Sequence, residues 1–217
     1  MKFFIDTANL EAIKEIKAMG MCDGVTTNPS LMAQAGRQDT DALLKEICDL
    51  VQGPVSGEVV ALDAEGMIAE GRRLAGISEH MVVKIPTTLE GLKAMKVLSD
   101  EDIPVNATLV FSTAQALLVA KTGAAYVSPF VGRLDDISSE GMELIAQIRM
   151  VYDNYGMETQ ILAASIRHPM HMVESMLQGA DCATLPPKVL YQLLQHPLTD
   201  RGLENFLADW KTLGKDL

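Results

Sequence analysis

The stretch Met81-Val82-Val83-Lys84-Ile85-Pro86 places one lysine inside an apolar run that ends at a proline. Such a run is typical of a strand in a parallel sheet that helices cover on both faces. A buried ammonium must be paired, must extend to water, or must lose its proton. Burial lowers the pKa of an amine and so favours its nucleophilic form, which makes Lys84 a candidate catalytic residue. This stretch alone is equally compatible with an edge-strand lysine that faces water.

Strand and helix patterns alternate on both sides of this stretch. The predicted strands are residues 2–6, 23–28, 55–60, 81–86, 103–108, 125–128, 160–164 and 182–185. Predicted helices lie at 10–19, 30–34, 39–51, 64–77, 113–121, 141–155, 169–178 and 188–194, and Thr87 to Glu90 has the spacing of a capping box that opens another. Eight such units in 217 residues predict an α/β fold, a single (β/α)8 TIM barrel. The alternative, an open doubly wound sheet, usually carries a glycine-rich phosphate loop, which this sequence lacks.

One domain is predicted to span residues 1–217, with an extra C-terminal helix at about 200–213 after a Thr199 cap. Its apolar stripe consists of Leu203, Phe206, Leu207, Trp210 and Leu213. The favoured interpretation is a helix that packs on its own barrel. The alternative is an arm that contacts a neighbouring subunit.

Composition and charge narrow the possible partners. The formal net charge of −11 argues against nucleic acid or an anionic membrane as the main partner. The first residues do not resemble a secretory signal, and no apolar run reaches about 18 residues, so we expect a cytoplasmic protein. Cys22, Cys48 and Cys182 are widely spaced in apolar settings, which favours reduced buried thiols.

The expected strand ends are unusually polar. In chain order they carry Asp6, Thr26, Asn28, Glu58, Lys84, Asn106, Thr108, Ser128, Phe130, Ser165 and Arg167. In such barrels the carboxyl ends of the strands form one mouth, where chemistry takes place. A lysine among carboxylates suits Schiff-base chemistry on a ketone, with Asp6 and Glu58 as acid/base candidates. Alternatively, Asp6 forms a turn and Glu58 is only a structural ion-pair partner of Lys84.

A phosphate site is predicted beside this mouth. Arg133, Ser165 and Arg167 follow the sixth and seventh strands, close to where barrels often bind phosphate. The alternative for both arginines is an ordinary surface position. His168 and His171 have no third ligand at suitable spacing, so a helix start after Pro169 explains them better than a metal site.

Seven motifs make the sequence resemble the small transaldolases of the group that includes the fructose 6-phosphate aldolases. They are FIDTAN (4–9), GVTTNPSL (24–31), GEVV (57–60), VVKIP (82–86), NATLVFS (106–112), YVSPFVGRLDD (126–136) and AASIRHP (163–169). The resemblance covers essentially the whole chain. It implies that Lys84, on the fourth strand, forms the Schiff base, and that no metal or organic cofactor is needed.

The resemblance also implies further roles. Asp6 would handle the hydroxyl proton during carbon–carbon cleavage, and Glu58 and Thr108 would hold a proton-shuttling water. Asn28 and Asn106 would hydrogen-bond the dihydroxyacetone unit. Ser128 would orient the substrate, whose phosphate Arg133, Ser165 and Arg167 would hold. A homo-oligomer, commonly a decamer of two pentamers, is also implied.

Two positions separate the subgroups of this family. The fructose 6-phosphate aldolases have tyrosine in place of Phe130 and glutamine in place of Glu58, so the pair found here favours a transaldolase. A phenyl ring cannot donate a proton to an enamine intermediate, which would then wait for an aldehyde acceptor. The alternatives are an aldolase that releases free dihydroxyacetone, and a non-catalytic phosphosugar-binding barrel in which Lys84 merely pairs with Glu58.

Overall fold

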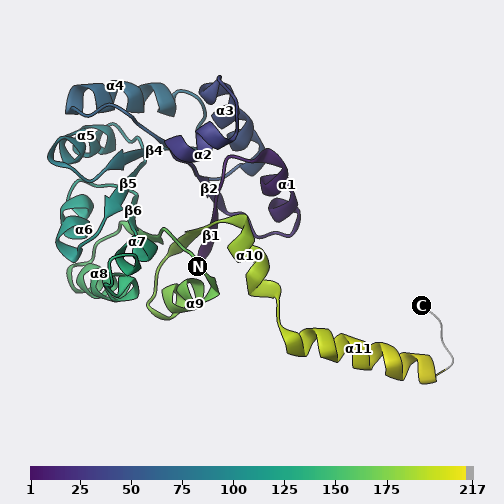
Figure 1. Ribbon diagram of the computed structural model, residues 1–217. Coiled ribbons are helices and arrows are strands. Elements are labelled where there is room, and N and C mark those ends of the chain that lie inside the picture. The colour runs from purple at the N-terminus through teal and green to yellow at the C-terminus, as the bar shows by residue number, and fades with distance from the viewer. Residues whose placement is uncertain (214–217) are drawn as a thin grey trace.

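The chain folds into a closed barrel of eight parallel strands inside a ring of helices (Figure 1). The computed structural model describes residues 1–213. The strands pair in chain order, and β8 closes on β1: β1 (Lys2–Asp6), β2 (Gly24–Thr26), β3 (Val55–Glu58), β4 (Met81–Pro86), β5 (Val105–Val110), β6 (Tyr126–Pro129), β7 (Gln160–Ala163) and β8 (Cys182–Leu185). The predicted (β/α)8 barrel is therefore confirmed.

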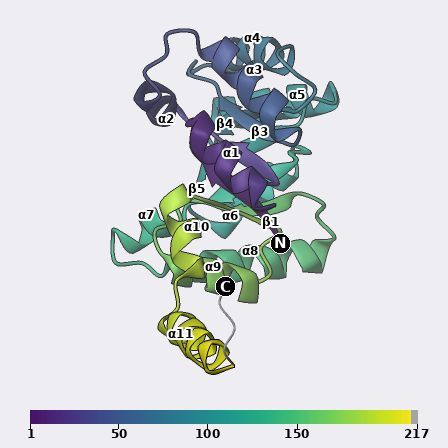
Figure 2. The same ribbon diagram turned by 90° about the vertical axis from the view of Figure 1, so that its right-hand side faces the viewer.

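Most of the helices surround the barrel, and only α11 projects away from it, as two perpendicular views of residues 1–213 show (Figures 1 and 2). The helices are α1 (Leu10–Ala18), α2 (Pro29–Gln34), α3 (Thr40–Val51), α4 (Ala64–Ala75), α5 (Leu89–Asp100), α6 (Thr113–Ala120), α7 (Val131–Asp135), α8 (Gly141–Tyr155), α9 (Pro169–Leu177), α10 (Pro187–Leu194) and α11 (Pro197–Thr212). Asn9 begins α1 as predicted, because its side chain accepts from the backbone N–H groups of Glu11 and Ala12.

The barrel interior has an apolar layer beneath a polar one. The apolar layer is a cluster of Phe4, Val82, Tyr126, Leu162 and Cys182. Two residues further along their strands, Phe4, Val82, Tyr126 and Cys182 are followed by Asp6, Lys84, Ser128 and Thr184. Since side chains two apart in a strand share a face, each of these strands places a polar group directly above an apolar one. The apolar layer thus separates the polar layer from the amino-terminal end of the barrel.

Gly24 makes room for this apolar layer. A Cβ atom at Gly24 would lie 2.6 Å from a ring atom of Phe4. The Phe4 ring in turn packs edge-on against Tyr126, with 5.7 Å between ring centroids. A side chain at residue 24 would therefore displace the largest members of the layer.

Several predicted boundaries and caps differ from the structure. Strand β5 runs two residues further along the chain than expected because its register shifts between Ala107 and Val110, where Leu109 has a φ of 58°. The capping-box assignment at Thr87 is wrong. Thr88 caps α5 by accepting from Gly91 N–H, whereas Thr87 Oγ1 donates to the Thr108 carbonyl. The short helix α7 was not predicted.

Helix α11 projects away from the barrel (Figures 1 and 2). It begins at Pro197 after a His196 cap, so the Thr199 cap is wrong. No residue of α11 is buried, and Phe206 is 71% exposed. The favoured packing of this helix on its own barrel is therefore not found, and its apolar stripe faces outward in the single chain.

Two further sequence expectations concern location and thiols. None of the helices within residues 1–213 is long and apolar enough to cross a membrane. All three cysteines are unpaired; Cys48 and Cys182 are buried, whereas Cys22 is half-buried.

Candidate active site

The strand register makes several of the predicted catalytic residues direct neighbours on adjacent strands. Glu58 on β3 pairs with Lys84 on β4, and Lys84 pairs with Asn106 on β5. On the other side of the mouth, Asp6 on β1 pairs with Thr26 on β2. Residues that are distant in sequence are thus neighbours because these register pairs place them side by side on adjacent parallel strands.

Lys84 is held by an ion pair and a backbone hydrogen bond. It is 5% exposed; its Nζ lies 2.9 Å from Glu58 Oε2 and donates to the Thr27 carbonyl at 3.0 Å. A closed barrel has no edge strand, so the alternative of a lysine facing water is wrong. Glu58 is the base within direct reach of the ammonium proton, and it could take that proton before the amine attacks a carbonyl.

Asp6 accepts from a chain of two hydroxyl groups. Thr26 Oγ1 donates to Asp6 Oδ1 at 2.8 Å and lies 2.6 Å from Thr184 Oγ1. Because the single hydroxyl proton of Thr26 goes to Asp6, Thr184 donates to Thr26. Burial raises the pKa of Asp6 above its ordinary value, although the Thr26 bond and the Lys84 charge oppose the shift. A carboxyl group of this kind is suited to exchanging protons with a substrate hydroxyl.

Asn106 is hydrogen-bonded to serine side chains on the two strands β3 and β6. It is fully buried; its Nδ2 donates to Ser56 Oγ at 3.1 Å, and its Oδ1 accepts from Ser128 Oγ at 2.7 Å. Within residues 1–213, the buried Thr108 Oγ1 has no hydrogen-bond partner. Thr108 thus retains its donor and acceptor capacity, as a group that binds a small molecule must.

Nine of the twelve predicted site residues line one cavity of about 200 Å³. They are Asp6, Thr26, Asn28, Lys84, Ser128, Phe130, Arg133, Ser165 and Arg167, and Ala164 and Thr184 complete the lining. The other three, Glu58, Asn106 and Thr108, do not line it. Glu58 is paired with Lys84, and Asn106 is hydrogen-bonded to Ser128, so each contacts a residue that lines the cavity.

The arginines lie on the side of the cavity formed after β6 and β7. Among the described residues, Arg133 has no carboxylate partner, and its guanidinium carbon lies 5.3 Å from the Phe130 ring centroid. Arg167 pairs with Asp136 at 2.8 Å on the exposed rim. Ser165 has a φ of 59°, a left-handed conformation that costs a non-glycine residue about 1 kcal/mol. One unpaired and one partly paired guanidinium suit an anionic group.

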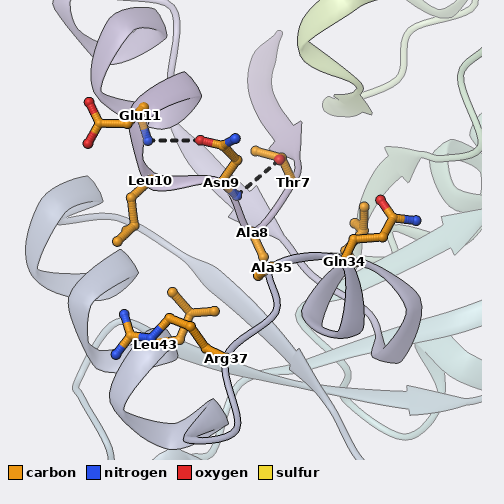
Figure 3. Close-up of a pocket in the computed structure, with 10 residues that line it drawn as sticks. Thr7, Ala8, Asn9, Leu10, Glu11, Gln34, Ala35, Arg37 and Leu43 are labelled. Carbon is orange, nitrogen blue, oxygen red and sulfur yellow. Dashed lines mark hydrogen bonds between the residues drawn. The ribbon is translucent and has the colours of Figure 1, made fainter.

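A larger cavity of about 540 Å³ lies outside this site, among α1, α2 and α3 (Figure 3). Thr7, Asn9, Glu11, Gln34 and Arg37 are among its lining residues. Asn9 and Thr7 use polar groups there on hydrogen bonds that shape the start of α1. Neither Lys84 nor any of its predicted catalytic neighbours, Asp6, Glu58 and Thr108, borders this cavity. We therefore place the candidate site in the smaller cavity, which Lys84 lines.

Sequence reasoning missed Ser56 and Thr184. Ser56 precedes Glu58 by two residues, and Thr184 occupies an otherwise apolar strand. The period of two along a strand, which placed Val82 and Lys84 on one face, would have found Ser56. Thr184 becomes recognisable only when barrel closure brings β8 beside β1.

The fold and the position of the site first define a class. The protein is a (β/α)8 barrel with a polar cavity at the carboxyl ends of its strands, where barrel enzymes have their active sites. A sequence profile of the family described as transaldolase/fructose-6-phosphate aldolase matches residues 3–217. The chain therefore belongs to this enzyme family.

Curated relatives agree along their whole length. A probable transaldolase of Aquifex aeolicus is 61% identical over 211 residues, which cover 97% of both chains. A probable transaldolase of Dinoroseobacter shibae is 59% identical over 217 residues and covers both chains completely. Another, from Methanococcus maripaludis strain C7, is 59% identical over 97% of this chain and 98% of its own length.

Similar solved structures support the fold alone. Inosine 5′-monophosphate dehydrogenase from Legionella pneumophila has a TM-score of 0.59 at 15% identity, over 85% of this chain and 58% of that one. Thiamine phosphate pyrophosphorylase from Pyrococcus furiosus has a TM-score of 0.57 at 16% identity, over 85% of each chain.

The raised pKa of Asp6 predicts that Asp6→Asn stabilises the protein. Because the pKa in the fold lies above the ordinary value of 3.8, ionisation of Asp6 opposes folding. This penalty is complete above the folded-state pKa and disappears as the pH falls below the ordinary value. We expect Asp6→Asn to raise Tm at pH 7, and the difference to shrink as the pH approaches 4, in calorimetry from pH 4 to 8.

Glu158→Gln, at an exposed position between α8 and β7, is the control for loss of a surface carboxylate, and its Tm should follow that of the native protein at every pH. An Asp6→Asn variant with a lower Tm than the native protein at pH 7 would contradict the direction of the pKa shift.

Proposed function

We propose that the protein is a transaldolase that moves a dihydroxyacetone unit from a ketose phosphate to an aldose phosphate through a Schiff base on Lys84. Donors would be sedoheptulose 7-phosphate or fructose 6-phosphate, and acceptors glyceraldehyde 3-phosphate or erythrose 4-phosphate. The observation that carries this proposal is the buried Lys84–Glu58 pair beside a cavity that two arginines border. We place the reaction in the pentose phosphate pathway of the cytoplasm.

The reaction begins with transfer of the Lys84 ammonium proton to Glu58. The amine attacks the ketose carbonyl carbon, and the carbinolamine gains a proton and loses water to give an iminium. Glu58 and the unpartnered Thr108 hydroxyl hold the water of this step. No metal or organic cofactor is required, because the iminium itself accepts the electron pair of the bond that breaks.

Carbon–carbon cleavage uses Asp6. It removes the proton from the hydroxyl group on the far carbon of the breaking bond; that oxygen becomes the aldehyde, and the bond electrons form an enamine on Lys84. The aldose phosphate leaves, the enamine attacks a second aldehyde, and hydrolysis releases the new ketose. Thr26 and Thr184 orient Asp6, since their hydroxyls form the chain that ends at its carboxylate.

The remaining polar groups bind the substrate. Asn28 uses its side-chain oxygen to cap α2, accepting from Leu31 N–H at 3.0 Å, which leaves its amide group to donate to the dihydroxyacetone unit. Ser128, oriented by Asn106, contacts the same unit. Arg133, Ser165 and Arg167 hold the phosphate at the opposite end of the sugar.

We also propose a homo-oligomer in which α11 contacts a neighbouring subunit. The support is its outward apolar stripe, because exposed Leu203, Phe206 and Leu207 on one helix are unusual in an isolated monomer. The family resemblance implies a decamer of two pentamers. Sugar phosphates are the other proposed partners, and neither nucleic acid nor a membrane is among them.

Replacement of Lys84 tests the Schiff base. After borohydride reduction with fructose 6-phosphate, the native protein should gain one dihydroxyacetone-derived mass on Lys84, and Lys84→Met should gain none. We expect transfer activity to fall by at least about 10³-fold, since the nucleophile is lost. Lys93→Met, on the surface of α5, should label on Lys84 as the native protein does.

Lys84→Met leaves the Glu58 carboxylate, whose side chain is only 16% exposed, without its partner, which destabilises the fold. The double variant Lys84→Met/Glu58→Gln removes both charges, and circular dichroism should show that it is folded while it stays unlabelled. Labelling of either variant at the native level would contradict the mechanism. Ligand binding that survives in these variants, together with a native protein that shows no turnover, would favour the non-catalytic barrel.

Substitution of Phe130 tests whether the dihydroxyacetone unit is transferred to an acceptor or released. Phe130→Tyr adds a hydroxyl that can protonate the enamine, so we expect the formation of free dihydroxyacetone from fructose 6-phosphate, without an acceptor, to rise several-fold. Phe111→Tyr is the matched control, because that ring lies 5.8 Å from Phe130, centroid to centroid, and does not line the cavity. Rapid release of dihydroxyacetone by the native protein would show instead that it is an aldolase.

A charge introduced into the apolar stripe of α11 tests whether this helix holds the proposed oligomer together. Phe206→Glu should lower the mass measured by light scattering without changing the far-ultraviolet circular dichroism of the barrel. Asn205→Glu adds the same charge one residue away and should leave the mass unchanged. An unaltered mass for Phe206→Glu would exclude α11 as the oligomer contact.

A further inference from the structure

The two arginines of the proposed phosphate site come from different segments of the chain. Arg133 lies on α7, which follows β6, whereas Arg167 lies in the connection between β7 and α9. Helix α8 and strand β7 separate them in sequence. Two guanidiniums bind one phosphate most tightly when their spacing is held to within about 0.5 Å of the productive geometry, so a rigid connection between the two segments favours binding.

His171 joins these segments. Its Nε2 lies 2.7 Å from Asp135 Oδ2 at the end of α7, and its Nδ1 accepts the backbone N–H of Arg167 at 3.2 Å. The second oxygen of Asp135 accepts from Gly141 N–H at the start of α8. One imidazole therefore connects the helix that carries Arg133 with the backbone of Arg167.

These bonds define the chemical state of the imidazole. Since Nδ1 accepts from an N–H group, the ring is neutral and carries its proton on Nε2, which donates to Asp135. The ring is 4% exposed, and burial lowers the pKa of His171, which agrees with a neutral ring. Both nitrogens are thus used, one on each segment.

Close packing joins the same two segments at Gly132. A Cβ atom there would lie 2.2 Å from the Ser165 carbonyl oxygen and 2.7 Å from Arg167 Cγ. Helix α7 therefore packs directly against the segment that carries the other phosphate ligands. A small displacement of α7 would change the distance between Arg133 and Arg167.

We propose that His171 is a positioning residue which, through Asp135 and the backbone of Arg167, fixes the spacing of the two arginines and so sets the affinity for the substrate phosphate. This inference rests on the phosphate site proposed above. His171 does not line the cavity, and none of its hydrogen bonds within residues 1–213 involves Lys84 or Asp6. Its loss should therefore weaken phosphate recognition and leave the lysine chemistry intact.

Three substitutions separate the two bonds. His171→Gln keeps a donor for Asp135 and loses the acceptor for Arg167 N–H, whereas His171→Asn keeps an acceptor near Nδ1 and loses the Asp135 bond. Asp135→Asn presents an amide N–H to Nε2, which forces the proton to Nδ1 and against Arg167 N–H. The matched control is Ser175→Ala, which removes a buried hydrogen bond to the His171 carbonyl on the same helix without touching the imidazole.

Kinetics with fructose 6-phosphate and with unphosphorylated fructose as donors test the proposal, with erythrose 4-phosphate held saturating. We expect His171→Gln, His171→Asn and Asp135→Asn each to raise KM for fructose 6-phosphate about tenfold with little change in kcat, since each removes one buried hydrogen bond. Rates with fructose should remain at the native level. Calorimetry should show a matching loss of affinity for inorganic phosphate. Ser175→Ala should behave as the native protein in all three measurements.

Other kinetic outcomes would contradict either the role of His171 or the phosphate site. An equal loss with both donors in the three variants would show that His171 only maintains the fold, and native kinetics in all three would show that it has no positioning role. A native protein that uses fructose as readily as fructose 6-phosphate and does not bind phosphate would overturn the phosphate site itself, and this inference with it.

Discussion

The buried ion pair between Lys84 and Glu58 is the interaction on which the site depends. Removing two charges from water costs several kcal/mol for each ion, and the attraction offsets this only when geometry and additional hydrogen bonds are fixed. The barrel provides both, because β3 and β4 hold the residues opposite each other and the Thr27 carbonyl accepts from the ammonium. Barrel closure excludes an edge at which the lysine could reach water, so this geometry follows from the fold.

The apolar layer beneath the Lys84–Glu58 pair strengthens the electrostatic attraction between the two charges. Phe4, Val82 and Tyr126 fill the barrel below the polar level, and a low effective dielectric strengthens every interaction above them. The same burial imposes a cost, since it makes ionisation of Asp6 unfavourable and raises the pKa of this carboxyl group. Burial thus opposes the charged form of a carboxyl group that lines the candidate site, and groups with shifted pKa values are typical of functional sites.

The sequence predicts the barrel because its strands are local patterns, and periodicity along a strand identifies faces. Register, caps and helix contacts depend on neighbours that are distant in the chain. The shift in β5 at Leu109, the role of Thr184 and the unexpected α7 are therefore visible only in the assembled barrel. The stripe on α11 is a similar case: an amphipathic pattern identifies the apolar face of a helix without identifying the surface that covers it.

Phe130 lies where the two halves of the site meet. Lys84 and the polar residues around it lie on β1 to β5, whereas Arg133 and Arg167 follow β6 and β7. Phe130 is the N-cap residue of α7, and its ring contacts both Phe111 and the Arg133 guanidinium and lines the cavity that contains Lys84. A change at Phe130 therefore alters the cavity wall beside Arg133 without touching the Lys84–Glu58 pair. The two positions at which the family resemblance separates transaldolases from aldolases thus lie at the site itself: Phe130 lines the cavity, and Glu58 pairs with Lys84.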